Sequence, residues 1–440
     1  MRISRAAALF TCSCLALSVT ACGQTATRQP DSGQLGAYLY GADGNMSNPF
    51  GDAFEKQPGV LLGMKGTRPA TPLSEEFQGR LRAEDSSLTD FNYAGEAYDA
   101  VVIAALAAQV SGTTDPTIVK QHITGVTVGP EPCRTIKDCL AAAKEGRDVA
   151  YRGLTIRSGF TDAGEPSTTS YGTVHFGQSN HLDNGKTEYL RAGNEALAST
   201  AAPPKTTTPA GRSGAPLVIG GLMSSSLATN KARVAGARMA VKELNAAGGI
   251  LGTSVVWRDG DDGGKAETAI TQIGTHKQAG VHVLIGPSGS AVGLATIPEV
   301  VKRSMIMISP SNTNALLSQA DDQGFYFRTA PSDVLQARAI ADMIMRDGVR
   351  KVTLIGKKDA YGEGLIEGVK KELISAGMAG GNIQSLTFEV DGSKIKDAGA
   401  VAAAAQQAVG FNPDGVLVVG TIESADVVKA LVTAKLEIRH

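Results

Sequence analysis

From residue 216 to the C-terminus, short apolar runs alternate with longer segments in which apolar residues recur at helical spacing. The apolar runs predict buried strands near residues 217–220, 255–257, 281–286, 305–309, 352–356 and 416–420. The helical spacing predicts helices near residues 231–246, 266–279, 291–303, 363–376 and 424–434. Continuous apolar strands that alternate with helices are typical of parallel sheets covered on both faces. The pattern therefore predicts an α/β fold built from doubly wound parallel sheets.

Residues 36–197 show a different pattern. Residues 38–40 read as one more buried strand, and residues 93–110 carry apolar positions at helical spacing. From residue 151 to 176 the pattern is rich in β-formers, with a turn at 162–165. This segment lacks the repeated strand–helix units that a sheet of its own needs, so we expect it to be half of a larger fold.

A segment rich in Pro and Thr separates these two parts. Residues 198–215 have no apolar periodicity, which is typical of a semi-extended linker. The alternative, a loop inside one domain, is disfavoured by the length and composition of the segment. We therefore expect the chain to divide into residues 36–197 and 216–440.

The N-terminus has the three parts of an export signal, since two arginines precede an apolar stretch that is followed by small residues. The stretch is too short for a membrane span. The junction Val19-Thr20-Ala21-Cys22 resembles the bacterial lipobox, in which cleavage leaves a lipidated cysteine. We expect a lipoprotein signal peptide over 1–21, lipidation of Cys22 and a tether over 22–35. The chain would then be exported and held by its lipid on the extracytoplasmic face of the cell membrane; the alternative is an ordinary secretory signal.

The charge composition of the chain bears on the class of partner that it can bind. The 440 residues include 42 Lys and Arg against 43 Asp and Glu, for a net charge of −1, and no basic patch is evident. This balance disfavours a nucleic-acid partner. The hydrophobic fraction of 42% is enough for buried cores and excludes wholesale disorder.

Two of the cysteines are candidates for a disulfide. Cys133 and Cys139 lie six residues apart in a chain that we expect to be exported, so a short-loop disulfide is the default prediction. No His or further Cys clusters near them, so we expect no metal site.

Several segments of the second part resemble one known family. The matching segments are Gly286-Pro-Ser-Gly-Ser290 and residues 235–252, 308–313, 327–333 and 359–365. In this order they resemble the first half of the type I periplasmic-binding-protein family, the branched-chain amino-acid receptors of ABC transporters. The resemblance implies two α/β lobes with a ligand bound in the cleft and hinge closure around it.

The first part resembles the second half of the same family. Its matches are residues 41–44, 98–102 and 151–154 together with the cysteine pair. Because the halves stand in reverse order, the chain is expected to be a circular permutant whose linker joins the family's termini. One lobe would combine about 216–331 with 68–168, and the other 332–440 with 36–67 and 169–197. The alternative is two unrelated or incomplete domains, or a misjoined gene.

The resemblance also implies ligand-binding residues. Ser290, Ser311 and Thr313 would meet the ligand's carboxylate, with Ser288 beside them in the same loop; an N-cap is the alternative for Ser290. Asp43 occupies the acidic position that, in amino-acid-binding relatives, pairs with the α-ammonium of the ligand. The alternative is that Asp43 belongs to an ordinary Asp-Gly turn and that its side chain is solvated.

Two further residues complete this candidate set. Tyr361 matches a tyrosine that forms part of the cleft wall in the family; the alternative is that it packs in an ordinary loop. Glu423 follows the predicted strand 416–420 and could also contact the ligand. Glu423 is explained equally well as a solvated acidic residue at the start of a helix.

The resemblance implies a monomeric, non-enzymatic receptor without cofactors, which delivers an amino acid of the branched-chain type to an ABC permease. One departure widens the choice of ligand: residues 224–230 are polar where relatives carry an aromatic residue. Small amides, urea-like molecules and aromatic acids therefore remain open. A sensor without a permease is the alternative receptor. An α/β enzyme is disfavoured because the chain has no phosphate-loop signature, nucleophile elbow or His-Glu-x-x-His motif.

Overall fold

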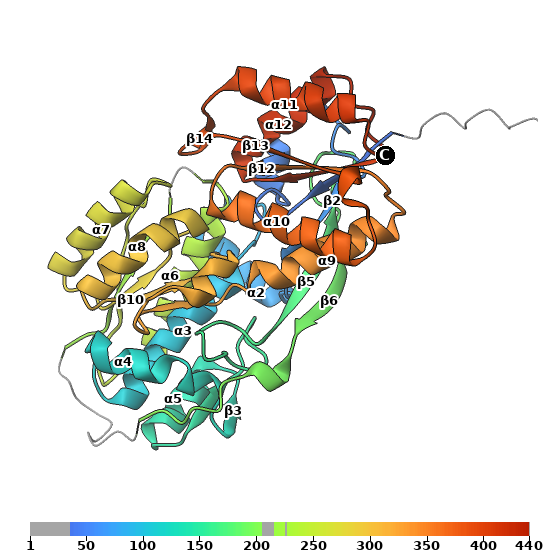
Figure 1. Cartoon of the computed structure of the whole chain (residues 1–440). Coiled ribbons are helices and arrows are strands. Elements are labelled where there is room, and N and C mark those ends of the chain that lie inside the picture. Colours follow the sequence, from blue (N-terminus) through green and yellow to red (C-terminus); the bar gives the residue numbers. More distant parts are fainter. Residues whose placement is uncertain (1–35, 205–214, 225–226, 440) are drawn as a thin grey trace, which may run out of the picture. The chain divides into compact units, whose positions relative to one another are not determined.

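The computed structural model describes residues 36–204, 215–224 and 227–439. The predicted signal peptide, Cys22 and the tether therefore lie outside the described residues, as does most of the predicted linker 198–215. The described chain forms two central sheets with helices on both faces (Figure 1), which confirms the predicted α/β class with parallel-sheet lobes. None of the described helices is long and apolar enough to cross a membrane.

The first sheet has five parallel strands in the order β11-β10-β9-β7-β8, and we call it and its helices lobe 1. Its strands are β7 (Val218–Gly221), β8 (Val256–Arg258), β9 (Val283–Ile285), β10 (Ile306–Ser309) and β11 (Tyr326–Arg328). Successive side chains of a strand point to opposite faces. Ile219, Ile285 and Ile308 accordingly pack in the core with α3 and α6, whereas Val218 and Leu284 pack in the core with α7 and α8.

The helices of lobe 1 come from both parts of the chain. They are α2 (Glu75–Glu84), α3 (Ala94–Ser111), α4 (Pro116–Ile123), α5 (Ile136–Lys144), α6 (Asn230–Ala246), α7 (Ala266–Gln278) and α8 (Ser290–Lys302). A small parallel pair, β3 (Glu131–Cys133) and β4 (Val149–Tyr151), lies beside α5. Every residue of α3 except Val110 is buried, because this alanine-rich helix packs against α4, α5, α6 and the sheet. A segment from the first part of the chain thus forms the centre of this lobe.

The second sheet has seven strands in the order β13-β12-β16-β1-β2-β5-β6, and we call it and its helices lobe 2. Its strands are β1 (Tyr38–Gly41), β2 (Lys65–Pro69), β5 (Thr168–His175), β6 (Glu188–Gly193), β12 (Val352–Lys357), β13 (Ile383–Phe388) and β16 (Gly415–Val419). The sheet differs from the wholly parallel prediction, because β5 runs antiparallel to both β2 and β6. Strands from residues 36–197 and from residues 352–419 thus belong to one sheet.

Two layers of helices cover lobe 2. The helices are α1 (Asn48–Asp52), α9 (Asp333–Arg346), α10 (Ala360–Ser375), α11 (Ala398–Phe411) and α12 (Ala425–Thr433). Leu39 and Val416 pack in the core with α1, α11 and α12, whereas Tyr40 and Leu417 pack in the core with α9 and α10. A short hairpin of β14 (Val390–Asp391) and β15 (Lys394–Ile395) follows β13.

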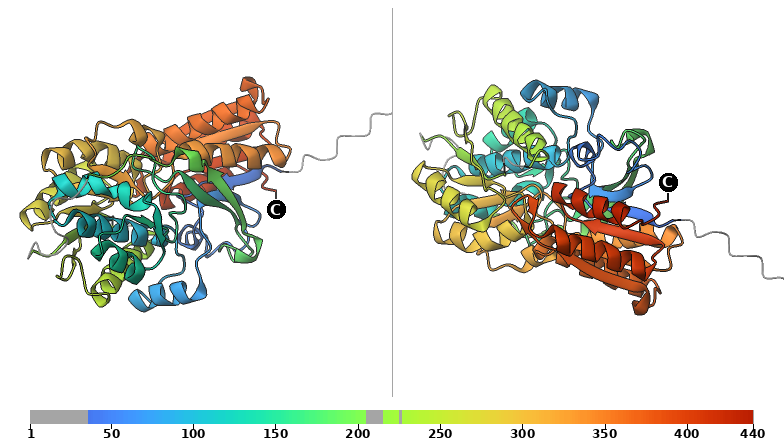
Figure 2. Two further views of the ribbon diagram at one scale, coloured as in Figure 1. Left: turned by 90° about the horizontal axis from the view of Figure 1, so that it is seen from below. Right: turned by 90° about the horizontal axis from the view of Figure 1, so that it is seen from above.

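Strand β1 joins residues that are far apart in sequence. Tyr38 pairs with Gly415 in the parallel ladder between β1 and β16. The Ala37 amide donates to the carbonyl of Glu437 at 2.7 Å, and the Arg439 amide donates to the carbonyl of Ala37 at 2.9 Å. The blue strand therefore lies beside the red C-terminal segment in both views of Figure 2.

Candidate ligand-binding site

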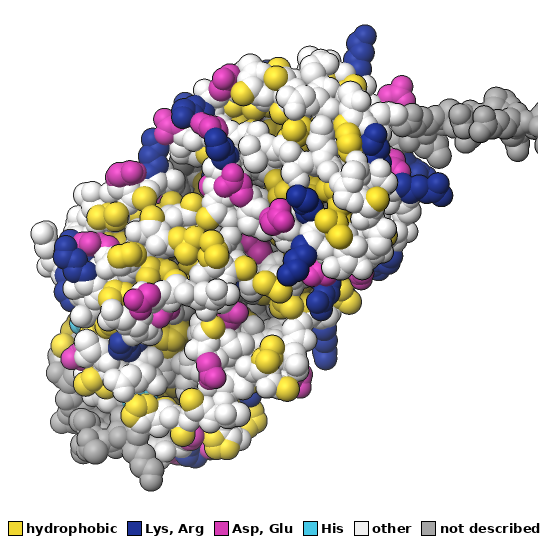
Figure 3. All heavy atoms as spheres, viewed as in Figure 1, with side chains coloured by type: hydrophobic (Ala, Val, Ile, Leu, Met, Phe, Trp, Pro, Cys, Tyr) yellow, Lys and Arg dark blue, Asp and Glu magenta, His cyan; other side chains and the backbone are white. Residues whose placement is uncertain are grey.

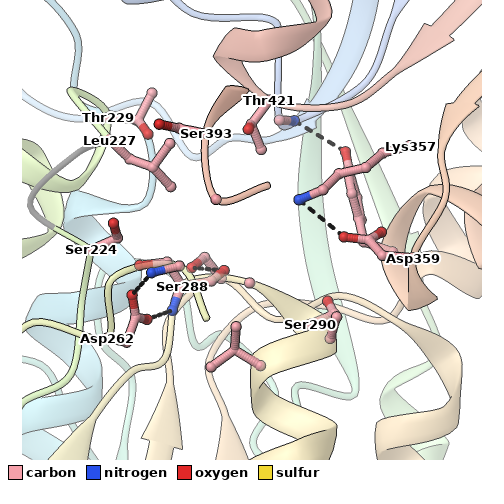
Figure 4. Close-up of a pocket in the computed structure, with 18 of the residues that line it drawn as sticks. Ser224, Leu227, Thr229, Asp262, Ser288, Ser290, Lys357, Asp359, Ser393 and Thr421 are labelled. Carbon is pink, nitrogen blue, oxygen red and sulfur yellow. Dashed lines mark hydrogen bonds and ion pairs between the residues drawn. The ribbon is translucent and has the colours of Figure 1, made fainter. Parts of the chain in front are cut away.

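A cavity lies between the two lobes and encloses about 840 Å³ of empty space, part of it open to solvent. Its walls come from the loops that follow β7, β8, β9 and β10 of lobe 1 and β1, β12 and β16 of lobe 2. Ser288 and Ser290 lie on one side of the open space, with Thr421 and Ser393 on the opposite side (Figure 4). The carboxyl ends of parallel strands thus meet here from two sheets, which is where α/β folds bind ligands.

Asp43 brings a buried carboxylate to the lobe 2 side of the cavity. Its Oδ1 accepts a hydrogen bond from the hydroxyl of Tyr361 at 2.7 Å, and its Oδ2 accepts one from the hydroxyl of Tyr93 at 2.7 Å. No described lysine, arginine or histidine forms an ion pair with it. Burial raises the pKa of Asp43, whereas the two hydroxyl donors act to lower it. The carboxylate is therefore oriented by neutral donors, and the charge of the buried Arg233 acts on it without forming an ion pair.

Backbone geometry holds the two tyrosines in place. Tyr93 precedes α3 with a left-handed φ of 62°, a conformation that a bulky residue adopts only under constraint. Gly44 packs so closely that a Cβ atom there would lie 2.4 Å from the carbonyl oxygen of Gly420. This close approach lets the Gly44 amide donate to the Tyr361 hydroxyl at 3.2 Å. The loop after β1 and the first turn of α10 are thereby joined at Asp43.

The N-terminus of α8 faces the cavity from lobe 1. Ser290 is the first residue of this helix, and the N-cap position belongs to Gly289, which forms no side-chain cap. The Ser290 Oγ accepts from the amides of Thr313 at 3.1 Å and Asn314 at 3.2 Å, which leaves its own proton for an acceptor in the cavity. Unpaired amides and the helix dipole make such an end a favourable place for a carboxylate.

A network of hydrogen bonds fixes the loop before α8. The Ser288 Oγ donates to Oδ1 of Asn230 at 2.9 Å, and the Ser311 Oγ donates to the carbonyl of Ser288 at 3.1 Å. Asp262 accepts from the amide of Gly264 at 2.8 Å and from the amide of Ser288 at 3.4 Å. Burial raises the pKa of Asp262 to about 6. The hydroxyls of Ser288 and Ser311 therefore donate their hydrogen bonds within this network and hold the loop in place.

Two of the predicted site residues do not line the cavity. Thr313 is buried and meets Ser290 only through its backbone amide, while its own Oγ1 has no partner in the described structure. Glu423 turns back on its own 3₁₀ turn, where it accepts from the amide of Thr421 at 2.9 Å. The carboxylate of Glu423 is engaged within this turn, and Thr421, not Glu423, lines the cavity.

The cavity also contains charged residues that the sequence did not reveal as site residues. Arg233 and Asp262 contribute from lobe 1, and Lys357 and Asp359 contribute from lobe 2. The Nζ of Lys357 lies 3.0 Å from Oδ2 of Asp359, so these two neutralise each other (Figure 4). Charged residues near strand ends are ordinarily solvated. These four line a cavity because the opposite lobe faces them, and the sequence does not show which segments face each other.

Other predicted features lie away from this cavity. Cys133 and Cys139 form a disulfide between β3 and α5, and neither lines the cavity. Within the described ranges, no group of three His, Cys, Asp or Glu side chains lies together as a metal site requires. Acidic and basic side chains are interspersed over the face in Figure 3, in keeping with the net charge of −1.

Comparison with known proteins identifies the second part of the chain. The family model described as periplasmic binding protein matches residues 218–436. The Leu/Ile/Val-binding protein homolog 3 of Brucella melitensis is 29% identical over 171 residues, which are 38% of this chain and 46% of that protein. The Leu/Ile/Val-binding protein BraC3 of Rhizobium johnstonii is 28% identical over 144 residues, which are 32% of this chain and 39% of that protein. The chain thus spans less than half the length of these relatives.

Solved structures resemble it over a similar extent. The leucine binding protein LivK from Thermotoga maritima is 21% identical, with a TM-score of 0.39 over 46% of this chain and 56% of that chain. A solute binding protein of an ABC transporter from R. palustris, solved with benzoate, is 20% identical, with a TM-score of 0.43 over 51% of this chain and 61% of that chain.

The family match covers the elements from β7 to α12, which contribute the α8 terminus and Tyr361 to the cavity. The matched relatives are named as binding proteins, in agreement with the prediction of a receptor that is not an enzyme. Through residues 218–436, this chain belongs to the periplasmic binding protein family.

Proposed function

We propose that this chain is an extracytoplasmic solute-binding receptor that delivers an amino acid, or a similar small polar molecule, to an ABC permease. The family of residues 218–436 supports the binding role, and the names of the matched relatives favour an amino acid. The cavity between the lobes is the proposed binding site, because it lies beyond the carboxyl ends of strands from both sheets.

One observation carries this proposal: the Asp43 carboxylate is buried in the cavity wall with no ion pair among the described residues, and the N-terminus of α8 faces the same space. A buried carboxylate is unfavourable until a positive group pairs with it. An α-ammonium supplies that charge, and the α-carboxylate of the same molecule suits the helix end and the Ser290 hydroxyl. The two features together match the two ends of an α-amino acid.

Calorimetry on the purified chain tests the binding role. We expect at least one L-amino acid from a panel to bind, and Asp43→Asn to weaken that binding by about 100-fold, because the ammonium loses its charged partner. Asp52→Asn is the matched control, since Asp52 is exposed and its carboxylate bonds only His181 at 2.9 Å among the described residues. If no amino acid, amide or carboxylate binds, the receptor role is wrong. Equal affinity in Asp43→Asn would refute only the ammonium assignment.

We also propose that residues 36–197 are the permuted second half of the binding protein. Support comes from the sheet of lobe 2, in which strands from residues 38–193 and 352–419 share one hydrogen-bonded array. The contact between Ala37 and Glu437 places residues from the two parts side by side, as a direct connection would require. A rearranged gene encoding residues 216–439 followed by 36–204 should then yield a protein with the same ligand affinity. A rearranged chain that does not fold would contradict the permuted order.

The lipid anchor is proposed from the resemblance of residues 19–22 to a lipobox. Metabolic labelling with an alkyne-bearing fatty acid should mark the wild-type chain and leave Cys22→Ser unmarked and released from the membrane fraction. Labelling of Cys22→Ser at the wild-type level would refute this anchor.

Delivery to a permease has its own test, because a sensor would bind the same ligand. Cells that lack the chain should lose uptake of the radiolabelled ligand, and the wild-type gene should restore it. Unchanged uptake would favour the sensor.

A further inference from the structure

The short hairpin of lobe 2 forms part of the cavity wall. Its strands β14 and β15 run antiparallel, with Asp391 opposite Lys394. The two residues of the turn between them, Gly392 and Ser393, line the cavity and are partly buried. Asp391 and Lys394, on either side of the turn, are exposed. The turn therefore lies between the ligand space and solvent.

The hairpin is compact and is fixed to lobe 2. Its turn has only two residues, and Gly392 takes a left-handed φ of 63° at the first of them, as a type II′ turn requires. At the base, the Lys396 amide donates to the carbonyl of Glu389 at 2.9 Å, and the Lys396 Nζ lies 3.0 Å from Oε2 of Glu389. Val390 and Ile395 pack against the core of lobe 2. The hairpin therefore moves together with lobe 2.

The tip of the hairpin reaches lobe 1. Nζ of Lys265, the N-cap residue of α7, lies 2.5 Å from Oδ1 of Asp391. A Cβ atom on Gly392 would lie 3.5 Å from Cε of Lys265, so the turn also lies against the lysine stem. Gly264 and Gly392, the neighbours of this ion pair, both line the cavity, one from each lobe. The ion pair thus spans a rim of the cavity, which we define by Gly264, Gly392 and Ser393.

The two lobes meet along this rim. Figure 4 places Ser393 on the same side of the open space as Leu227 and Thr229, which belong to the segment before α6 in lobe 1. Because the hairpin is fixed to lobe 2, any motion that separates the lobes carries its tip away from Lys265. The rim is consequently shut in the arrangement of the lobes described above, and it opens when they part.

We propose, on the basis of the proposed receptor function, that the β14–β15 hairpin is a lid over the bound molecule. It shuts the rim when the lobes close, and a bound molecule leaves only after the tip of the hairpin has separated from lobe 1. The lid sets how long the receptor retains its ligand, because it acts on the exit path. Asp43 and the N-terminus of α8 set which molecule binds.

Shortening the hairpin tests the lid on the full chain. In the variant, Asn-Gly replaces residues 391–394, so that a two-residue turn follows the retained pair of Val390 and Ile395. The twenty L-amino acids are the probes, and stopped-flow fluorescence follows the one that binds most tightly. In about 0.5 M salt, which screens the attraction between Lys265 and Asp391, we expect dissociation to be about tenfold faster than in wild type. Lys394→Gln is the matched control, because Lys394 is exposed on the same hairpin and does not line the cavity; it should keep the wild-type rate.

The outcomes separate the lid from the function on which it rests. An unchanged dissociation rate in the shortened chain overturns the lid and leaves the receptor function intact. Small-angle X-ray scattering follows the compaction that the bound amino acid induces; faster dissociation together with a loss of this compaction also overturns the lid, because the hairpin would then act on closure of the lobes. If no amino acid binds to wild type, both proposals fail.

A second variant keeps the test decisive if the shortened chain does not fold. Replacing Asp391 and Ser393 by glycine loosens the tip without shortening the hairpin, so dissociation should again be faster than in wild type. A wild-type dissociation rate in this variant overturns the lid.

Discussion

The hydroxyl of Tyr361 donates to Oδ1 of Asp43 at 2.7 Å, although 318 positions separate the two residues in the chain. The other carboxylate oxygen accepts from Tyr93, so three segments of the sequence meet at one buried acid. Both hydroxyls favour the ionised form of Asp43, which is the form that can pair with an ammonium.

Removing either phenol should therefore weaken ligand binding through Asp43. In Tyr361→Phe and in Tyr93→Phe, we expect an affinity loss of about tenfold and a loss of about 1–2 kcal/mol in the free energy of unfolding, because a buried acceptor loses a donor. Calorimetry and chemical denaturation measure the two effects. Tyr189→Phe is the control, since Tyr189 is 53% exposed on β6 and should change neither quantity. Wild-type affinity in both buried variants would contradict the role given to Asp43.

A second buried acid controls the stability of the fold at neutral pH. Burial raises the pKa of Glu96 in α3 from 4.5 to about 8, so the folded chain keeps a proton that the unfolded chain releases. Stability should consequently fall as pH rises from about 4.5 to about 8 and then level off. Glu96→Gln removes this dependence, so its melting temperature should rise relative to wild type across that range and match wild type near pH 4.

Glu76→Gln is the control for this titration, because Glu76 is exposed on α2. Thermal denaturation at pH 4, 6 and 8 gives the comparison. A constant difference between Glu96→Gln and wild type at all three pH values would refute the shift.

The disulfide should stabilise the fold without influencing the ligand. It joins Cys133 and Cys139 across a sequence separation of 6, and closing so short a loop stabilises by about 2 kcal/mol. Replacing both cysteines by serine should lower the free energy of unfolding by that amount and leave ligand affinity unchanged. A large loss of affinity in this double variant would mean that the α5 region communicates with the cavity.

A surface ion pair joins the lobes beside the cavity. Nζ of Lys265, at the start of α7, lies 2.5 Å from Oδ1 of Asp391 in the β14–β15 hairpin, and the neighbouring Gly392 and Ser393 line the cavity. Both charged groups are exposed, so Asp391→Asn should leave the melting temperature unchanged. We expect it to speed ligand release at low ionic strength, as measured by stopped-flow fluorescence. The difference should vanish in about 0.5 M salt, where screening removes the attraction; a difference that persists there would rule out this electrostatic account.

The regular part of the fold was predictable because its sequence signals are local. Helices near 231–246 and 266–279 appear as α6 and α7 within one residue at each end, since apolar spacing defines them. Helix α11 was not predicted, because half of Ala398–Phe411 is alanine and the helix has few large apolar residues to mark a stripe. Strand β13 was missed because it lies at the sheet edge, with only Ile383 and Phe388 buried.

The candidate site was predictable only where a family pattern marks it. Asp43, Ser290 and Tyr361 came from the resemblance, and all three line the cavity. Arg233 also lines the cavity but gave no signal, because an arginine on a helix is normally solvated, whereas this one is buried and lies over the ring of Tyr93, 140 positions away. Such a role depends on contacts between distant segments, which spacing along one helix does not reveal.

The place of β1 between β16 and β2 has a consequence for how the chain is made. Tyr38 leaves the ribosome long before its ladder partner Gly415, so the central strand of lobe 2 waits for almost the whole chain to be synthesised. The helix α3 waits likewise for α6, against which it packs most extensively. Pairings so distant in sequence are slow to form and leave apolar surface exposed meanwhile. The first half of this protein therefore lacks the partners of β1 and α3 until later parts of the chain have been synthesised.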